Sequence, residues 1–438
     1  MILSCRLVLA ASVLLHLPVL AHAQEPAIDL DEARRAFEAA RQASEADGGR
    51  LWGAELYGPI FLVDRATRFV AADRADMEGV LEERDGVWVG TFPETMIAAN
   101  SATEWAGRRW TMVLWPTPSI PHERNRLLLH EMFHRAQDDI GLPAGNPTNA
   151  HLDTKDGRIW LRLEMRALAR ALTHEGAERR AAVEDALAFR ERRRSLFREA
   201  AAEEDILERN EGMAEYTGLV LSGLPEAVLP DRAAAALEER EERTSLTRSF
   251  AYATGPAYGL LLDVRNPAWR QALVDGASLR DLLAEAYEIT PTARPVEARL
   301  EPYGGERLIA LETARESQRR ERLAELRDRF LEGPTLRMTP GADFRYSFDP
   351  NAAVSLDEVG TVYEPVRVVD AWGILEAESA LLTRNAEGQI TGVVVAAPAG
   401  ADGPPTEGEG WTLALEEGWE IVSEEGPADW IVREISSP

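Results

Sequence analysis

Residues 124–134 read Arg-Asn-Arg-Leu-Leu-Leu-His-Glu-Met-Phe-His, and this stretch ends in the most specific pattern of the chain, H-E-x-x-H. His130 and His134 are spaced i and i+4, so on a helix both imidazoles lie on one face and can reach a single metal ion. Glu131 then lies beside a metal-bound water and can accept its proton. The surrounding leucines, Met and Phe indicate a buried helix, where two imidazoles and a carboxylate are costly unless they bind a metal or pair. The segment therefore predicts a catalytic zinc site.

A catalytic zinc takes three protein ligands and leaves one position for water, so a third ligand is needed. Two downstream glutamates in predicted helices are candidates, Glu211 and Glu164. We favour Glu211 because Gly212 allows close approach of a neighbouring helix. Glu215, one turn further on, can also accept from the free N–H of a ligand imidazole. Glu164 is the alternative third ligand, and its other interpretation is a buried partner for an arginine.

Residues 130–134 (H-E-M-F-H) followed by 210–214 (N-E-G-M-A) resemble the gluzincin zinc metallopeptidases, most closely the aminopeptidase N and leukotriene hydrolase group. In that group the N-E-G-x-A segment supplies the third zinc ligand, and the tyrosine of a Y-x-x-G segment hydrogen-bonds the oxyanion formed during hydrolysis. Residues 252–255 (Y-A-T-G) resemble the second segment, so the resemblance gives Tyr252 this role. It implies a gluzincin-like core, a Zn²⁺ cofactor and a peptide or protein substrate. The G-x-M-E-N segment with which the group grips a free amine is absent from the sequence.

Composition and charge limit the partners of this chain. It has 438 residues, of which 48 are basic and 75 acidic, giving a net charge of −27. Such a chain repels phosphate backbones, which argues against a nucleic-acid partner.

Residues 1–23 have the apolar run and the Ala-x-Ala end of a signal peptide, so we expect cleavage after Ala23 and export to the periplasm or beyond the cell. The single cysteine, Cys5, is removed with this segment, and no later apolar run is long enough to predict a transmembrane segment.

Hydrophobic patterning predicts an α+β protein with three regions after the signal peptide. Residues 24–120 form a helix and a mixed sheet, residues 121–332 form a helical catalytic region, and residues 333–438 form a small all-β module. The strand at 110–115 is either a core strand or one with an edge that could pair with an extended peptide. The arginine-rich segment 190–194 reads as part of a solvated helix face.

Two functions fit these observations. The first is an exported zinc metallohydrolase, most simply a peptidase with Glu131 as general base. The second is an exported, non-catalytic protein that binds metal or peptide on a gluzincin-like scaffold. The intact Glu131 favours the enzyme, because a non-catalytic relative has no need of a base between its two histidines.

Overall fold

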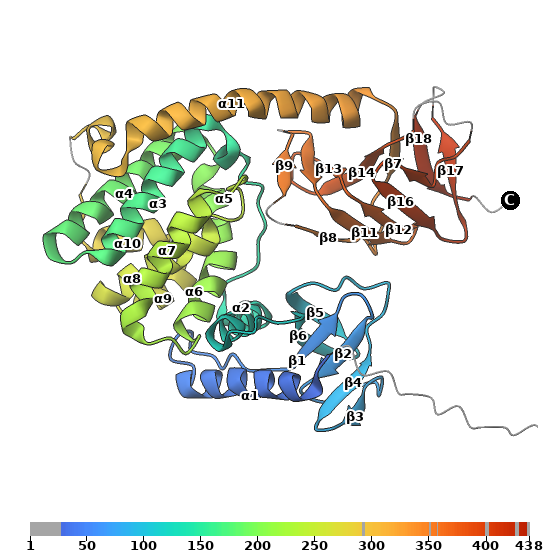
Figure 1. Ribbon diagram of the computed structural model, residues 1–438, viewed down its shortest axis with the longest axis horizontal. Helices are drawn as coiled ribbons and strands as arrows, with labels where there is room; N and C mark the ends of the chain where they lie inside the picture. Colours follow the sequence, from blue (N-terminus) through green and yellow to red (C-terminus); the bar gives the residue numbers. More distant parts are fainter. Residues whose placement is uncertain are drawn as a thin grey trace, which may run out of the picture.

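The computed structural model describes residues 28–290, 294–349, 352–356, 358–398, 403–424 and 429–435, so the expected signal peptide lies outside the described residues. The described chain is α+β, as the sequence predicts. An N-terminal helix and sheet are followed by a helical body and then by a C-terminal region of two further sheets (Figure 1). No helix in the described ranges has the length and apolar character needed to cross a membrane.

The N-terminal region consists of one helix packed on one sheet. Helix α1 (Leu30–Asp47) begins after Asp29, whose side chain accepts a hydrogen bond from the backbone N–H of Glu32. The helix ends at Gly48, which adopts the left-handed conformation with φ of 58°. The strands are β1 (Ile60–Asp64), β2 (Phe69–Ala72), β3 (Glu82–Arg84), β4 (Val87–Thr91), β5 (Ser101–Trp105) and β6 (Arg108–Trp115), in the sheet order β3-β4-β2-β1-β6-β5.

Strand β6, which directly precedes the metal-site helix, is an interior strand of this sheet. It pairs in parallel with β1, where Val113 lies opposite Leu62, and antiparallel with β5, where Thr103 lies opposite Trp110. Residues 111 and 112 pair on both sides, so the interpretation as an edge for a peptide is wrong there. Residues 113–115 pair with β1 alone, and on the other side the N–H of Leu114 donates to Oδ1 of Asn100 at 2.8 Å. The free edge on this side belongs to β5, which has too little apolar alternation to be predicted as a strand.

Helix α2 (Pro121–Ile140) lies between the sheet and the helical body, as Figure 1 shows. One face, with Leu128, Leu129 and Met132, packs against α1 and the sheet, while Phe133 and Ala136 pack into the helical body. The remaining helices of the body are α3 (Lys155–Thr173), α4 (Gly176–Leu196), α5 (Ala200–Leu207), α6 (Met213–Val220), α7 (Leu229–Glu241), α8 (Ala251–Arg265), α9 (Trp269–Val274) and α10 (Leu279–Ala286). Short helical turns are η1 (Ala150–Asp153), η2 (Glu208–Gly212), η3 (Glu226–Val228), η4 (Val296–Arg299) and η5 (Glu301–Tyr303).

The C-terminal region is a sandwich whose two sheets share one core. The strands are β7 (Thr335–Met338), β8 (Arg345–Phe348), β9 (Ala353–Ser355), β10 (Gly360–Tyr363), β11 (Val366–Asp370), β12 (Gly373–Ala377), β13 (Ala380–Arg384), β14 (Ile390–Ala396), β15 (Glu407–Gly408), β16 (Trp411–Leu415), β17 (Trp419–Ser423) and β18 (Trp430–Glu434). One sheet has the order β17-β18-β7-β14-β13-β10-β9 and the other β15-β16-β12-β11-β8. Buried side chains of both sheets, among them Leu336, Val393, Leu375 and Trp411, form one cluster.

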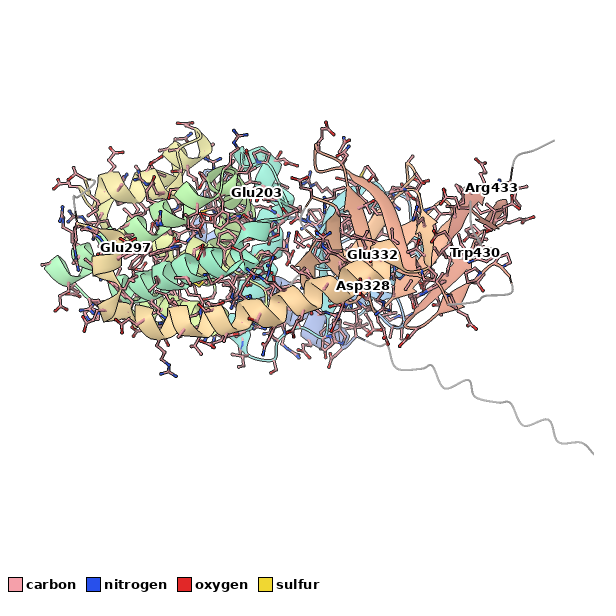
Figure 2. The ribbon with its side chains drawn as sticks, turned by 90° about the horizontal axis from the view of Figure 1, so that it is seen from above. Glu203, Glu297, Asp328, Glu332, Trp430 and Arg433 are labelled. Carbon is pink, nitrogen blue, oxygen red and sulfur yellow. The ribbon has the colours of Figure 1, made fainter. Side chains whose placement is uncertain are left out.

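Helix α11 (Gly305–Arg327) and the turn η6 (Asp328–Glu332) connect the helical body to the sandwich. Figure 2 shows this helix running along the molecule, with Asp328 and Glu332 at its sandwich end and Trp430 and Arg433 beyond them. Leu326 and Phe330 pack against Leu356, Val362 and Leu381 of the sandwich. The apolar contact holds the sandwich against the end of the helix.

Candidate metal centre

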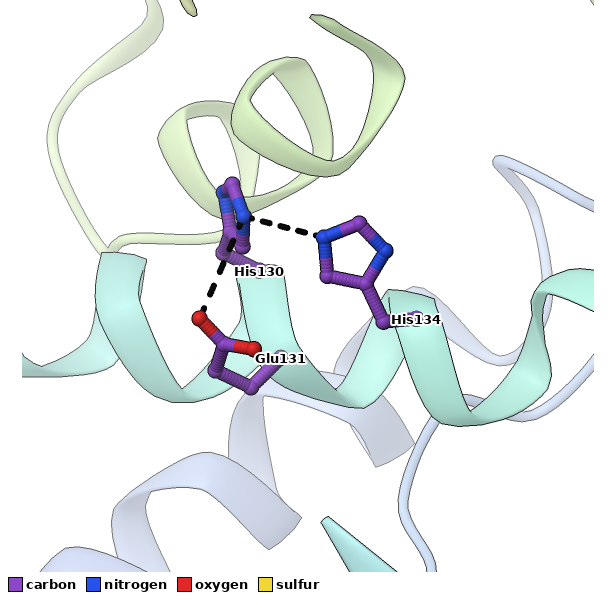
Figure 3. A group of neighbouring side chains, drawn as sticks. All are labelled: His130, Glu131 and His134. Carbon is purple, nitrogen blue, oxygen red and sulfur yellow. Dashed lines mark hydrogen bonds and ion pairs between the residues drawn. The ribbon is translucent and has the colours of Figure 1, made fainter. Parts of the chain in front are cut away.

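The centre is built on one face of α2. Figure 3 shows His130 and His134 on successive turns of this helix, with their rings turned toward each other and Glu131 beside them. The two Nε2 atoms are 3.2 Å apart. Both His130 and Glu131 are buried, at 5% exposure each. One ligand atom from each of His130, Glu131 and His134 lies within 4.8 Å of the others, so this buried group could bind a metal ion.

The outer nitrogens of both imidazoles already have partners. Nδ1 of His130 lies 3.0 Å from Oε2 of Glu215, and Nδ1 of His134 lies 2.9 Å from Oε1 of Gln137. Each Nδ1–H can donate to its oxygen, which fixes the tautomer and leaves both Nε2 atoms as unprotonated donors of lone pairs. The structure thus places Glu215 where the sequence analysis expects it. Gln137 was not singled out from the sequence, although it lies three residues after His134 on the same face.

Glu211 brings a third lone-pair donor to the two imidazoles. Its Oε2 is 3.4 Å from Nε2 of His134 and 3.6 Å from Nε2 of His130. Glu131, by comparison, reaches only His130, at 4.0 Å from its Nε2. Glu211 therefore lies closer than Glu131 to the Nε2 atoms of the two imidazoles.

The charges around His130, His134 and Glu211 favour a cation between these side chains. Burial alone would lower the pKa of His130, but the carboxylates of Glu211 and Glu215 raise it to about 10. Burial alone would raise the pKa of Glu211, yet the two imidazoles and Arg248 hold it well below its ordinary range. The Glu211 carboxylate therefore stays ionised beside the imidazoles, and a metal ion that binds between them takes the place of the proton that His130 would otherwise hold.

Glu131 is placed to exchange a proton instead. Its Oε2 is buried and has no hydrogen-bond partner among the described residues. Burial raises the pKa of its carboxyl group, and the nearby Glu211 raises it further, against the opposite effect of the two histidines. A buried carboxylate with a raised pKa and a free oxygen is suited to take a proton from water and to release it again.

Tyr252 and Arg248 hold Glu211 from two sides. The Tyr252 hydroxyl donates to Oε2 of Glu211 at 2.5 Å, and Nη2 of Arg248 donates to Oε1 at 2.7 Å. The Tyr252 ring is stacked on His130 with a centroid distance of 5.6 Å. Burial and the Glu211 carboxylate raise the pKa of Tyr252 well above 10, so the phenol keeps its proton and remains a donor. Arg248 carries no local signal in the sequence, because its role depends on tertiary contacts.

A close crossing of two backbones brings Glu211 and Tyr252 together. Glu211 lies in the π-helical turn η2, which runs into α6, and Tyr252 lies in the first turn of α8. A methyl group on Gly255 would come within 2.3 Å of the Cα of Gly212, so only glycine fits at this crossing. A π-helical turn at a functional site is a recurring arrangement. The expected close approach at Gly212 is thus part of the structure.

Glu164 lies in a different cluster. Its Oε1 accepts from Nε of Arg190 at 2.7 Å and from the Tyr258 hydroxyl at 3.0 Å, and its Oε2 accepts from Nη1 of Arg193 at 2.6 Å. Both carboxylate oxygens are therefore engaged in a fully buried ion pair, as the second interpretation of Glu164 expects. Arg190 and Arg193 are both 0% exposed, so the expectation that segment 190–194 lies on a solvated face is wrong for these two side chains.

We compared the chain with known proteins. No family model, no curated protein and no solved structure matches it. Function is therefore inferred from the geometry and chemistry of the site.

Proposed function

We propose that the protein is a zinc-dependent metallohydrolase of the gluzincin type, acting as a peptidase. The observation that carries this proposal is the triangle formed by Nε2 of His130, Nε2 of His134 and Oε2 of Glu211, with sides of 3.2, 3.4 and 3.6 Å. Ligand atoms about 2.05 Å from a tetrahedral zinc ion lie about 3.3 Å from one another. The donor set of two imidazoles and one carboxylate is also the set found in catalytic zinc sites.

The residues of this chain divide the chemistry among them. His130, His134 and Glu211 would hold the zinc ion, which when bound acts as a Lewis acid and makes a water molecule acidic near neutral pH. Glu131 takes the proton of the attacking water and returns it to the leaving amine.

The Tyr252 hydroxyl, which faces the ligand oxygen of Glu211, donates to the oxygen that gains charge at the scissile carbonyl. Glu215 and Gln137 keep both imidazoles in the required tautomer.

The order and the contacts of three segments support the gluzincin type. The H-E-M-F-H, N-E-G-M-A and Y-A-T-G segments occur in this order in the sequence. Contacts between His134 and Glu211, and between Tyr252 and Glu211, join all three segments. The Ala-x-Ala end of residues 1–23 supports export, and N-terminal sequencing of the secreted protein should give Gln24 as the first residue.

The proposal is tested by substituting the general base and leaving the ligands intact. Glu131→Gln should retain the zinc content of the wild type and lose peptide hydrolysis by a factor of about 10³ or more, because the amide cannot take the proton. Glu123→Gln, a glutamate on the same helix that pairs with Arg126, is the matched control and should keep its activity. A wild-type protein that binds zinc and cleaves no peptide in a mixed library would instead be the non-catalytic binding protein.

A further inference from the structure

A small cavity lies next to the candidate metal centre, where the helical body meets the sandwich. The body contributes Thr148, from the segment after α2, and Arg248, while the sandwich contributes Phe348, Tyr363 and Arg384. The cavity volume is about 20 Å³. That space accommodates a water molecule or a group about the size of a carboxylate.

The cavity lies between the metal centre and an open cleft. Phe348 also lines a cleft of about 1190 Å³ between the N-terminal sheet and the sandwich. Arg248 lies over the Phe348 ring, at 5.8 Å from its centroid, and donates to Glu211 at 2.7 Å. Phe348 and Arg248 therefore connect the lining of the cleft to the carboxylate beside the imidazoles.

Three buried N–H groups at this cavity lack partners. Within the described part of the chain, Nε and Nη1 of Arg248 and Nε of Arg384 make no hydrogen bond. The other nitrogens of Arg384 donate to the Gly388 carbonyl oxygen at 2.7 Å and to the Tyr363 hydroxyl at 3.2 Å. Leaving a buried donor on a charged group unsatisfied is costly, so such donors are expected to have a partner in the functional state.

The lining of the cavity specifies the charge of that partner. Among the described residues, the lining has two arginines and five hydroxyl-bearing residues but no Asp or Glu, in a protein of net charge −27. The hydroxyl-bearing residues are Thr148, Thr247, Ser355, Thr361 and Tyr363. A small anion with several acceptor lone pairs matches this lining, and a carboxylate is the anion of this kind that a peptide carries.

We propose that this cavity is the subsite for a carboxylate of the peptide substrate, with Arg248 and Arg384 as its cationic groups and Phe348 as its apolar wall. This inference rests on the proposed peptidase function and names its substrate class. One carboxylate group, that of Glu211, separates the Arg248 guanidinium from the imidazoles. Since an extended peptide advances about 3.3 Å per residue, the bound carboxylate lies one or two residues from the cleaved bond.

Paired peptides test the proposal and identify the source of the carboxylate. Acetyl-Ala-Ala-Phe-Ala is assayed as the free acid and as the C-terminal amide, and acetyl-Ala-Ala-Phe-Asp-amide is compared with its Asn counterpart. We expect kcat/KM to be about tenfold higher for the carboxylate-bearing member of at least one pair. Preference in the first pair identifies a C-terminal carboxylate, and preference in the second identifies an acidic side chain. Equal cleavage of both members in both pairs would overturn the subsite and leave the peptidase function intact.

Arg384 variants separate recognition from structure, because this residue lies on the sandwich and does not contact the ligands. Arg384→Met should lower kcat/KM about tenfold more for the carboxylate-bearing peptide than for its neutral counterpart, and Arg384→Lys should restore part of this preference. Arg433→Met, an exposed arginine elsewhere on the sandwich, is the control and should change neither value. An Arg384→Met variant that loses both members of a pair equally would show a structural role and overturn the proposal.

A binding measurement keeps the two proposals distinguishable. Titration of the same peptides into the zinc-loaded Glu131→Gln variant should give about tenfold tighter binding of the carboxylate-bearing member. If that difference is found while the wild type cleaves nothing, the subsite stands and the peptidase function fails. If acid and amide bind equally well, the cavity holds only water and the subsite is refuted.

Discussion

At the scale of single residues, the partners of the two Nδ1 atoms determine what the imidazoles can bind. Glu215 and Gln137 engage the Nδ1 atoms of His130 and His134, so both Nε2 lone pairs face Oε2 of Glu211. Three lone-pair donors that face one another repel unless a cation lies between them. In the proposed metal site, Glu215 and Gln137 would therefore contribute to metal affinity as well as the three proposed ligands.

Removing Glu215, the partner of the His130 imidazole, should lower the affinity for zinc. Glu215→Leu should weaken zinc binding by about 10- to 100-fold, because the imidazole loses the acceptor that fixes its tautomer and raises its basicity. Competition with a chelator measures the change. Glu123→Leu is the control, since Glu123 and Glu215 both pair with Arg126, while the His130 contact belongs to Glu215. Unchanged zinc affinity in Glu215→Leu would contradict the role given to Glu215.

The residues that could be predicted from sequence are those with a local pattern. His130, Glu131 and His134 fall within five positions, and Glu215 follows Glu211 by one helical turn. Arg248 could not be found in this way, because it reaches Glu211 from the turn before α8. The sequence favours Glu211 over Glu164 because Gly212 follows it, and the tertiary contacts place Glu211 beside histidines and Glu164 beside arginines.

At the scale of secondary-structure elements, the crossing of η2 and α8 sets the distance between the Glu211 carboxylate and the Tyr252 hydroxyl. A methyl group on Gly218 would likewise lie 2.4 Å from the Arg126 carbonyl oxygen, so α6 and α2 are also in close contact. The ligands come from α2 and η2, and a shift of about 1 Å between these elements would open the triangle of donor atoms.

Gly255→Ala tests the crossing. The added Cβ would lie 2.3 Å from the Cα of Gly212, which is backbone and cannot move aside alone. We expect a loss of about 2–3 kcal/mol in the free energy of unfolding, together with weaker zinc binding. Denaturant unfolding and chelator competition measure the two effects. Gly403→Ala, where a methyl group meets nothing within 4 Å, should match the wild type; equal stability of Gly255→Ala would contradict the tight crossing.

The sequence did not predict which strands pair with β6 in the N-terminal sheet. Residues 110–115 were correctly predicted as a strand, because the run is apolar and ends before Pro116. Its neighbour β5 (Ser101–Trp105) has partly exposed, mostly polar residues, so nothing local marks it as a strand. Without that strand, β6 could not be recognised as interior.

At the scale of the whole molecule, buried charge joins the helices of the body. Arg190 and Arg193, on α4, bind Glu164 of α3, Glu208 of η2 and Glu204 of α5. Glu208 lies in the same turn, η2, as Glu211. A run of arginines and glutamates has the same local pattern on a solvated helix as in a buried network, which is why segment 190–194 was misjudged.

The cluster gives the stability of the protein a defined dependence on pH. Burial alone would raise the pKa of Glu204, but Arg193, His151 and Arg194 hold it well below its ordinary value of 4.5. A folded-state pKa below the unfolded one means that the carboxylate stabilises the fold above about pH 4.5, and that this contribution is lost as the pH falls through the folded-state pKa. The free energy of unfolding should therefore decrease as the pH falls below about 4.5.

Glu204→Gln checks this assignment. The variant should be less stable at pH 7 by about 3–5 kcal/mol, because it leaves buried arginines without their partner, and its stability should depend less on pH below about 4.5. Glu420→Gln, at an exposed pair with Arg433, should behave as the wild type. Denaturant midpoints measured from about pH 3 to pH 7 decide the question. A Glu204→Gln curve parallel to that of the wild type would refute the pH assignment.

The proposed zinc site consists of His130, His134 and Glu211, which together hold one zinc ion. It is tested most directly by the zinc content of the purified protein, measured for the wild type, for Glu211→Ala and for Glu164→Gln, a conservative change in the neighbouring ion-pair cluster. We predict about one zinc ion per chain in the wild type and in Glu164→Gln, and none in Glu211→Ala. A wild type that binds no metal after zinc is supplied, or a Glu211→Ala variant that binds it as tightly as the wild type, would contradict the account.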